Sequence, residues 1–250
     1  MDKGESAVTK LVLNLIDDKI EDINLFIEET KDKEINNIPK DKIDTFFQQG
    51  FNKVRLSKTD YLILRNYTGY NFKGINSILR DKWTYEYNGI LNDEKKYRYR
   101  ENAENISELI NKFPKTKESF KVYRGVTIDA FKDYGIDNLN DLVYLKDRFI
   151  YERGFTSTSL IRDTSYFDKE IEGKLYNIEL EIVVTENSQD GMPLIGYKLS
   201  FSSEQNEYVF DRGALIRIID VDIRDNYAYL KGILIPKKIY EENKEKGKRR

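Results

Sequence analysis

The chain has 250 residues, with 42 basic and 44 acidic side chains, a formal charge of −2 and 39% apolar residues, so it can bury a core and is too hydrophobic to be disordered. It contains no cysteine and no histidine, which excludes disulfides, thiolate nucleophiles, Ser-His-Asp triads and zinc sites built from sulfur or imidazole. Any chemistry must therefore use carboxylates, hydroxyls, amides, lysine, tyrosine or arginine, and the near-neutral charge gives no general electrostatic basis for binding nucleic acid.

The first half of the chain reads as helical. Apolar residues at three-and-four spacing predict an amphipathic helix over residues 6–30, and the amino-terminal residues hold no apolar run long enough for a signal peptide or a membrane span. A second helix is expected over 41–49, ending at Gly50. Residues 56–80 predict a helix, a break rich in tyrosine and glycine, and a short helix from Phe72. A further helix over 101–113 should end before Pro114.

After Pro114 the pattern changes to β-branched and aromatic runs with partial two-residue alternation, separated by turn residues. The runs are FKVYRGV, FTSTSL, KLYNIELEIVV, EYVFDRGALIRIIDV and AYLKGILI. Helices first and strands second indicate an α+β fold, with N-terminal helices packed on a mainly antiparallel β-sandwich core. We expect a single domain with a helical segment over 1–56, a core over 57–240 and a charged tail over 241–250.

The first segment of chemical interest is Tyr123-Arg124-Gly125. An arginine in an apolar strand is costly to bury unless it pairs with an anion, and the glycine after it lets a ligand approach the backbone. A phosphate suits that pairing, because a guanidinium binds it with two hydrogen bonds. The same tripeptide also fits an edge strand whose arginine reaches into water.

The second segment is the run FTSTSL. Strand alternation places the hydroxyls of Ser157 and Ser159 on one face and those of Thr156 and Thr158 on the other, so one face can offer hydrogen-bond donors to a cleft. An ordinary threonine-rich strand has the same composition.

The third segment, FSSEQNE, leads directly into an apolar strand. If residues 205–207 are extended, the amide of Gln205 and the carboxylate of Glu207 share a face, and Glu204 and Asn206 point away. A carboxylate there, near serine hydroxyls, can stabilise a cationic sugar. Read alone, the segment also fits a solvated strand edge.

The order of the three segments is more specific than any one of them. Ser157 follows Arg124 by 33 residues and Glu207 follows Ser157 by 50. In this order the chain resembles the mono-ADP-ribosyltransferase toxins of the Arg, Ser-Thr-Ser, Glu class, the cholera-toxin-like branch, and most of all the small single-domain exoenzymes that modify Rho-type GTPases. The resemblance covers roughly residues 57–236 and implies the ADP-ribosyltransferase fold, NAD as the substrate and no metal.

The resemblance also implies roles for individual residues. Glu207 would hold a ribose hydroxyl and stabilise the oxocarbenium-like sugar that forms when nicotinamide leaves. Ser157 would orient Glu207, and Arg124 would bind a phosphate. Asn76 and Arg80 would hold the other side of the dinucleotide. The NAD pocket would be shaped by Thr158 and Ser159.

Two loops complete the expected site. In the loop after FTSTSL, Arg162 could reach a phosphate and Phe167 could stack on the nicotinamide ring, although an incidental surface aromatic is an equal reading of Phe167. The loop over 189–205, with Tyr197 and Phe201, would present the target. In the family, glutamine two positions before the catalytic glutamate goes with asparagine as the acceptor.

Gln205 is therefore expected to act with Glu207 in catalysis, and its identity favours an asparagine as the acceptor on the target. A one-residue bulge would instead turn Glu204 toward the target and favour arginine.

We therefore expect a monomeric, NAD-dependent protein mono-ADP-ribosyltransferase, a toxin or effector whose target can be a small GTPase and which has no membrane partner. It would be secreted or injected and act in the host cytoplasm, or be a phage enzyme made inside the infected cell. Two alternatives stay open: the same site acting on a nucleic acid, helped by the basic tail, and a catalytically silent binding module that docks through its 18 tyrosines.

Overall fold

The computed structural model describes residues 19–80, 93–195, 199–200 and 206–240. Its helices are α2 (Ile20–Lys31), α3 (Ile43–Lys53), α4 (Lys58–Asn66), α5 (Phe72–Leu79), α6 (Asp93–Lys112) and α7 (Lys237–Tyr240). Shorter helical turns are η1 (Lys40–Lys42), the π-helical η2 (Tyr67–Asn71), η3 (Ile128–Tyr134), η4 (Leu139–Leu145) and η5 (Arg162–Thr164). No helix within these ranges is both long and apolar enough to cross a bilayer.

The strands follow the helices, as predicted for an α+β chain. They are β1 (Phe120–Val126), β2 (Phe149–Glu152), β3 (Thr156–Ser159), β6 (Ile178–Val184), β7 (Gly191–Leu194), β8 (Glu207–Phe210), β9 (Ala214–Arg224) and β10 (Tyr227–Ile235), with a small hairpin of β4 (Glu170–Ile171) and β5 (Lys174–Leu175). The eight larger strands form one hydrogen-bonded series in the order β2-β9-β10-β6-β1-β3-β8-β7.

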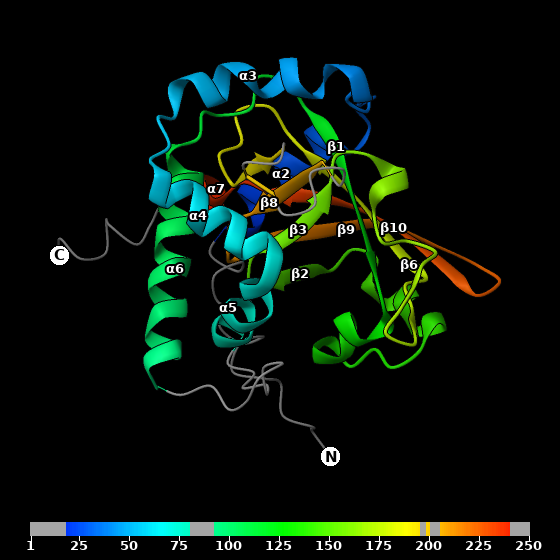
Figure 1. Ribbon diagram of the computed structural model, residues 1–250. Helices are drawn as coiled ribbons and strands as arrows, with labels where there is room; N and C mark the ends of the chain where they lie inside the picture. Colours follow the sequence, from blue (N-terminus) through cyan, green and yellow to red (C-terminus); the bar gives the residue numbers. More distant parts are fainter. Residues whose placement is uncertain (1–18, 81–92, 196–198, 201–205, 241–250) are drawn as a thin grey trace, which may run out of the picture.

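The sheet is mainly antiparallel, and the pair β10 and β6 is parallel. In Figure 1 the helices α4, α5 and α6 stand together beside the sheet, and α3 crosses its upper end. The strands β1, β3 and β8 are neighbours in the order. These are the strands that carry the three segments of chemical interest, so the topology brings those segments together.

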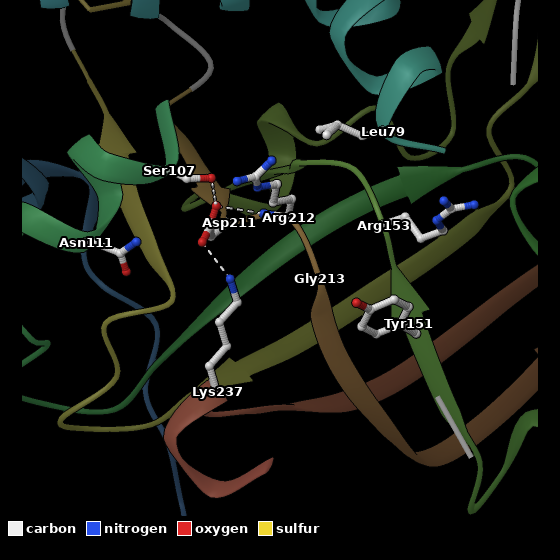
Figure 2. Close-up of a pocket in the computed structure, with 9 residues that line it drawn as sticks. All are labelled: Leu79, Ser107, Asn111, Tyr151, Arg153, Asp211, Arg212, Gly213 and Lys237. Carbon is white, nitrogen blue, oxygen red and sulfur yellow. Dashed lines mark hydrogen bonds and ion pairs between the residues drawn. The ribbon is translucent and has the colours of Figure 1, made fainter. Parts of the chain in front are cut away.

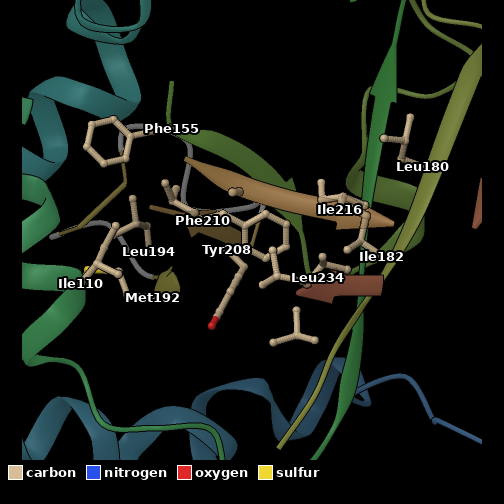
Figure 3. Packing of buried hydrophobic residues seen from close by; sticks show 14 of the residues in the cluster. Ile110, Phe155, Leu180, Ile182, Met192, Leu194, Tyr208, Phe210, Ile216 and Leu234 are labelled. Carbon is tan, nitrogen blue, oxygen red and sulfur yellow. The ribbon is translucent and has the colours of Figure 1, made fainter. Parts of the chain in front are cut away.

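The core is continuous from the helices into the sheet. Tyr208 of β8 is 1% exposed, and its ring lies 5.3 Å from the ring of Phe120 and 5.7 Å from that of Phe210. Figure 3 shows the same cluster, with Ile110 of α6 facing the strand residues. This packing fixes β8 in place and therefore fixes the residue that begins it, Glu207.

Two helix predictions are corrected. Gly50 does not end a helix, because α3 continues to Lys53. A Cβ atom on Gly50 would lie 2.5 Å from the ring of Phe113, so this glycine serves a close contact with the residue after α6. The helix α6 begins at Asp93, eight residues before the predicted start, because its first two turns are charged and hide the apolar period.

The predicted break after α4 is also different in form. The helix α4 starts with a capping box of Ser57 and Asp60, and it then continues through the π turn η2 directly into α5. The two helices and the π turn therefore form one uninterrupted run from Lys58 to Leu79. Of the helix predicted over residues 6–30, the part from Ile20 is described and forms α2.

Of the eight strands of the main sheet, two were not predicted, β2 and β7. They are the two edges of the sheet. The sequence of β7, Gly-Met-Pro-Leu, contains turn residues, and Pro193 is tolerated because an edge strand leaves some backbone N–H groups unpaired. The predicted target-presenting loop over 189–205 thus begins with an edge strand that pairs with β8.

Candidate active site

A cavity of about 320 Å³ opens where β1, β3 and β8 face α5. Seven of the residues predicted for the site line it: Asn76, Arg80, Arg124, Ser157, Thr158, Ser159 and Glu207. They come from four elements that are far apart in the chain. The sequence order of the three segments therefore corresponds to one place in the structure.

Glu207 is the carboxylate of this cavity, and it is 7% exposed. In the antiparallel pair of β3 and β8, Ser159 lies opposite Glu207 and Ser157 lies opposite Val209, so Ser157 is the diagonal neighbour of Glu207 on the same face. Burial raises the pKa of Glu207 to about 7, against the opposing effects of a hydrogen bond from Ser157 and the positive charge of Arg124. In the free protein a fraction of the Glu207 carboxyl groups is therefore protonated near neutral pH.

Arg124 lies in the interior of the cavity. Its Nη1 donates to the backbone carbonyl of Ser157 at 3.2 Å. Burial lowers its pKa, the charge of Glu152 raises it, and the neighbouring guanidinium of Arg80 lowers it. Within the described ranges no carboxylate forms an ion pair with Arg124. A half-buried cation in this state favours an anionic ligand.

Asn76 and Arg80 come from the end of α5. The Oδ1 atom of Asn76 accepts a hydrogen bond from the backbone N–H of Phe155 at 2.8 Å, which ties the helix to the start of β3. Arg80 donates from Nε to Glu152 at 2.8 Å. A Cβ atom on Gly154 would lie 2.7 Å from Asn76 Oδ1, so the glycine permits this close packing of helix and strand.

The hydroxyls of Thr158 and Ser159 make internal hydrogen bonds. Thr158 donates to the carbonyl of Tyr208 at 2.6 Å. Ser159 donates to the carbonyl of Ile161 at 2.7 Å and lies 2.5 Å from the hydroxyl of Thr164. These two residues thus shape the cavity wall and the turn after β3.

Two predicted loop residues lie outside the cavity lining. Arg162 forms a bidentate pair with the buried Glu179 of β6, with distances of 2.9 and 2.5 Å. The ring of Phe167 lies 5.7 Å from that of Tyr227 and 5.3 Å from that of Tyr229. Both side chains therefore face other strands in this structure, and the expected phosphate contact of Arg162 and ring stacking of Phe167 find no support in the arrangement.

The structure does not describe Gln205 and Glu204, which were predicted to select the acceptor, or Tyr197 and Phe201, which were predicted to present the target. The described neighbour Asn206 has a φ of 46°, in the left-handed region. The extended segment therefore begins at Glu207. Asn206 is not extended, so the predicted two-residue alternation from Gln205 to Glu207 is interrupted at Asn206.

The sequence reading missed several residues of the cavity. Tyr166 and Tyr176 line it, with their rings 5.9 Å apart in an edge-to-face arrangement. Phe72 of α5 also lines it. Tyr67 does not line the cavity. It is buried in the π turn beside the lining residue Thr68, and its hydroxyl lies near Ser157 and Asn76 without a hydrogen-bond partner among the described residues.

The positions of the missed residues carried some signal. Tyr67 belongs to the tyrosine-rich segment before α5, and π turns often occur at functional sites.

A second cavity, of about 350 Å³, lies beside Leu79 and is shown in Figure 2. Three of its charged groups form ion pairs within the protein, and the fourth, Arg153, donates to the carbonyl of Arg80 at 3.3 Å. Lys237 and the hydroxyl of Ser107 contact the buried carboxylate of Asp211 at 2.5 and 2.6 Å. Arg212 pairs with Glu104 at 2.5 Å. Among the described residues, no group of three or more acidic side chains could hold a metal ion.

Comparison with known proteins agrees with this geometry. The family model described as ADP-ribosyltransferase exoenzyme matches residues 44–246, which extends beyond the region of resemblance read from the sequence. The chain therefore belongs to the ADP-ribosyltransferase exoenzyme family. Members of this family use NAD as the source of ADP-ribose. A search of curated protein sequences found no match.

Solved structures share the fold. C3stau2 from S. aureus, solved with NAD, has a TM-score of 0.61 and 18% identity, covering 82% of this chain and 100% of its own. The Clostridium limosum C3 exoenzyme has a TM-score of 0.62 and 20% identity, covering 81% and 98%. Plx2a, an ADP-ribosyltransferase toxin from Paenibacillus larvae, has a TM-score of 0.59 and 20% identity, covering 81% and 100%.

Proposed function

We propose that this chain transfers ADP-ribose from NAD to a side chain of a target protein, with Glu207 as the catalytic carboxylate. The observation that carries the proposal is the meeting of Glu207, Ser157 and Arg124 in one cavity, together with Asn76 and Arg80. The cavity holds two guanidinium groups, and ion pairing in the described chain neutralises one of them, through Glu152. The remaining positive charge suits a pyrophosphate.

The bond cleaved in this reaction joins nicotinamide to its ribose, and positive charge develops on the sugar as nicotinamide leaves. A fixed carboxylate beside the ribose stabilises that charge, and Glu207 occupies such a position when the phosphates lie on Arg124 and Arg80. The hydroxyl of Ser157, on the neighbouring strand and the same face, favours the ionised form of the carboxylate. Asn76 fixes α5 against β3, so the two arginines keep their spacing.

The acceptor we propose is an asparagine, because Gln205 stands two positions before Glu207, and the target can be a small GTPase of the Rho type. Two of the similar structures are described as C3-type proteins, which supports a target of that class. The acceptor proposal rests on sequence position, since residue 205 lies outside the described residues.

Incubation of the protein with labelled NAD and a host-cell lysate tests the function, followed by mass mapping of the labelled protein. We expect one discrete band whose modified residue is asparagine, and Glu207→Gln should abolish it. Glu104→Gln, which removes a carboxylate that does not line the cavity, is the matched control. Measurable NAD binding with no labelled protein in any lysate would defeat the transferase proposal. A modified arginine would refute the asparagine acceptor alone, and a product resistant to protease but not to nuclease would reveal a nucleic-acid target.

A further inference from the structure

Glu152 ends the edge strand β2 and contacts Arg80, which lines the cavity. It is the last residue of β2, and its backbone carbonyl accepts from Gly213 N at 2.8 Å, which fixes it against β9. Its side-chain Oε1 accepts from Arg80 Nε at 2.8 Å and from Gly154 N at 3.0 Å. One carboxylate oxygen therefore connects the end of α5 to the turn that leads into β3.

The pair of Glu152 and Arg80 is partly shielded from water. The side chain of Glu152 is 23% exposed and that of Arg80 is 30% exposed. An ion pair in such a place is screened less by solvent than a surface pair, and its geometry is better defined. Arg80 uses Nε for this contact, so among the described residues this pair leaves its two terminal amino groups available to a ligand in the cavity.

The charge of Glu152 also affects the second arginine. Arg80 and Arg124 line the same cavity, and the positive charge of Arg80 lowers the pKa of Arg124. The negative charge of Glu152 has the opposite effect on Arg124. Without a counter-charge, the guanidinium of Arg80 would be expected to turn away from its buried neighbour toward water.

We propose that Glu152 is a positioning residue for NAD, which acts by holding the guanidinium of Arg80 toward the pyrophosphate. This inference rests on the proposed function. A positioning role predicts that NAD affinity falls when the carboxylate is removed. A simple charge effect predicts the opposite, because a carboxylate near two phosphates repels them and its removal would tighten NAD binding. The positioning role differs also from a purely structural role, which would act through Gly154 and the stability of the turn.

Calorimetric titration of the 250-residue chain with NAD distinguishes these roles. In Glu152→Gln the amide oxygen can still accept from Gly154, and the ionic contact with Arg80 is lost. We expect this variant to bind NAD about tenfold more weakly while its unfolding midpoint in urea stays within error of the wild type. ADP-ribose, which lacks nicotinamide, should lose affinity by the same factor because the pyrophosphate is the group affected.

The matched control is Glu104→Gln, which breaks the pair of Glu104 with Arg212 and changes the net charge by the same amount. It should leave NAD affinity unchanged. A double-mutant cycle then tests whether Glu152 acts through Arg80: in an Arg80→Ala background, Glu152→Gln should change NAD affinity less than twofold.

Each result has a definite meaning. If the wild type binds no NAD, the proposed function fails first. If the wild type binds NAD and Glu152→Gln binds it equally well or more tightly, the positioning role is wrong. The role is also wrong if the tenfold loss persists in the Arg80→Ala background, because Glu152 would then act through another group.

Discussion

The carboxylate of Glu207 makes the free protein less stable as it ionises, and this can be measured. Burial raises its pKa from 4.5 to about 7. A raised pKa means that the folded state binds the proton more tightly than the unfolded state, so the stabilising effect of the proton is complete below pH 4.5 and is lost as the pH rises to about 7. At about 1.4 kcal/mol per tenfold change, the loss amounts to roughly 3 kcal/mol at pH 8.

Glu207→Gln replaces the group with a neutral side chain of similar shape and should remove this loss. Urea unfolding of the NAD-free protein between pH 4.5 and 8.5 measures it. We expect the variant and the wild type to have similar free energies of unfolding at the acidic end, and the variant to be more stable by up to about 3 kcal/mol at the basic end.

Glu104→Gln is the control, because Glu104 is an exposed carboxylate whose pKa is lowered by its hydrogen bond to Arg212. Its replacement should not increase stability at any pH. If Glu207→Gln is less stable than the wild type at pH 8, or if the difference between them does not vary with pH, then Glu207 is not held in a site that disfavours its charge and the reasoning fails.

Three further predictions concern the surroundings of the site. Gly125→Ala should destabilise the protein by about 1 to 3 kcal/mol in urea unfolding, because the added Cβ would lie 2.1 Å from the backbone nitrogen of Phe167; an unchanged midpoint would contradict this contact. Tyr166→Leu should weaken NAD binding measured by calorimetry, because Tyr166 lines the cavity. Phe167→Leu should mainly lower the unfolding midpoint, because its ring packs against Tyr229. If Phe167→Leu weakens NAD binding and Tyr166→Leu does not, the predicted stacking of Phe167 on nicotinamide is favoured. Lys237→Met should cost about 3 kcal/mol in urea unfolding at pH 8 by leaving the buried carboxylate of Asp211 without its cation, and a loss below 1 kcal/mol would argue against that pairing.

The strands that form the centre of the sheet could be predicted from the sequence, and its edges could not. The predicted run FKVYRGV coincides with β1, whose residues are buried on both sides and are mostly β-branched or aromatic. The edge strand β7 is completely buried although it contains glycine and proline. Its burial comes from packing against α6 and from pairing with β8, contacts between segments that no local pattern reports.

The site shows a similar division. From the three ordered segments, Arg124, Ser157 and Glu207 line one cavity because neighbouring strands carry them. The choice between Tyr166 and Phe167 could not be made from the sequence, because the two are adjacent and equally aromatic. Contacts with distant segments distinguish the two residues. The backbone of both packs against Gly125, and the ring of Phe167 packs against Tyr227 and Tyr229 of the β9–β10 hairpin.

The two residues with unfavourable electrostatics in the free protein are also the two to which the proposed function gives the main roles. Arg124 is a half-buried cation with no carboxylate in salt-bridge contact among the described residues, and Glu207 is a buried acid whose charged form is disfavoured. Neither arrangement stabilises the free protein, and each becomes favourable when an opposite charge arrives. A pyrophosphate next to Arg124 and a sugar cation next to Glu207 supply those two charges in one molecule. The unfavourable electrostatics of the free cavity therefore indicate a ligand that is negative at one point and becomes positive at another, as NAD does when its glycosidic bond breaks.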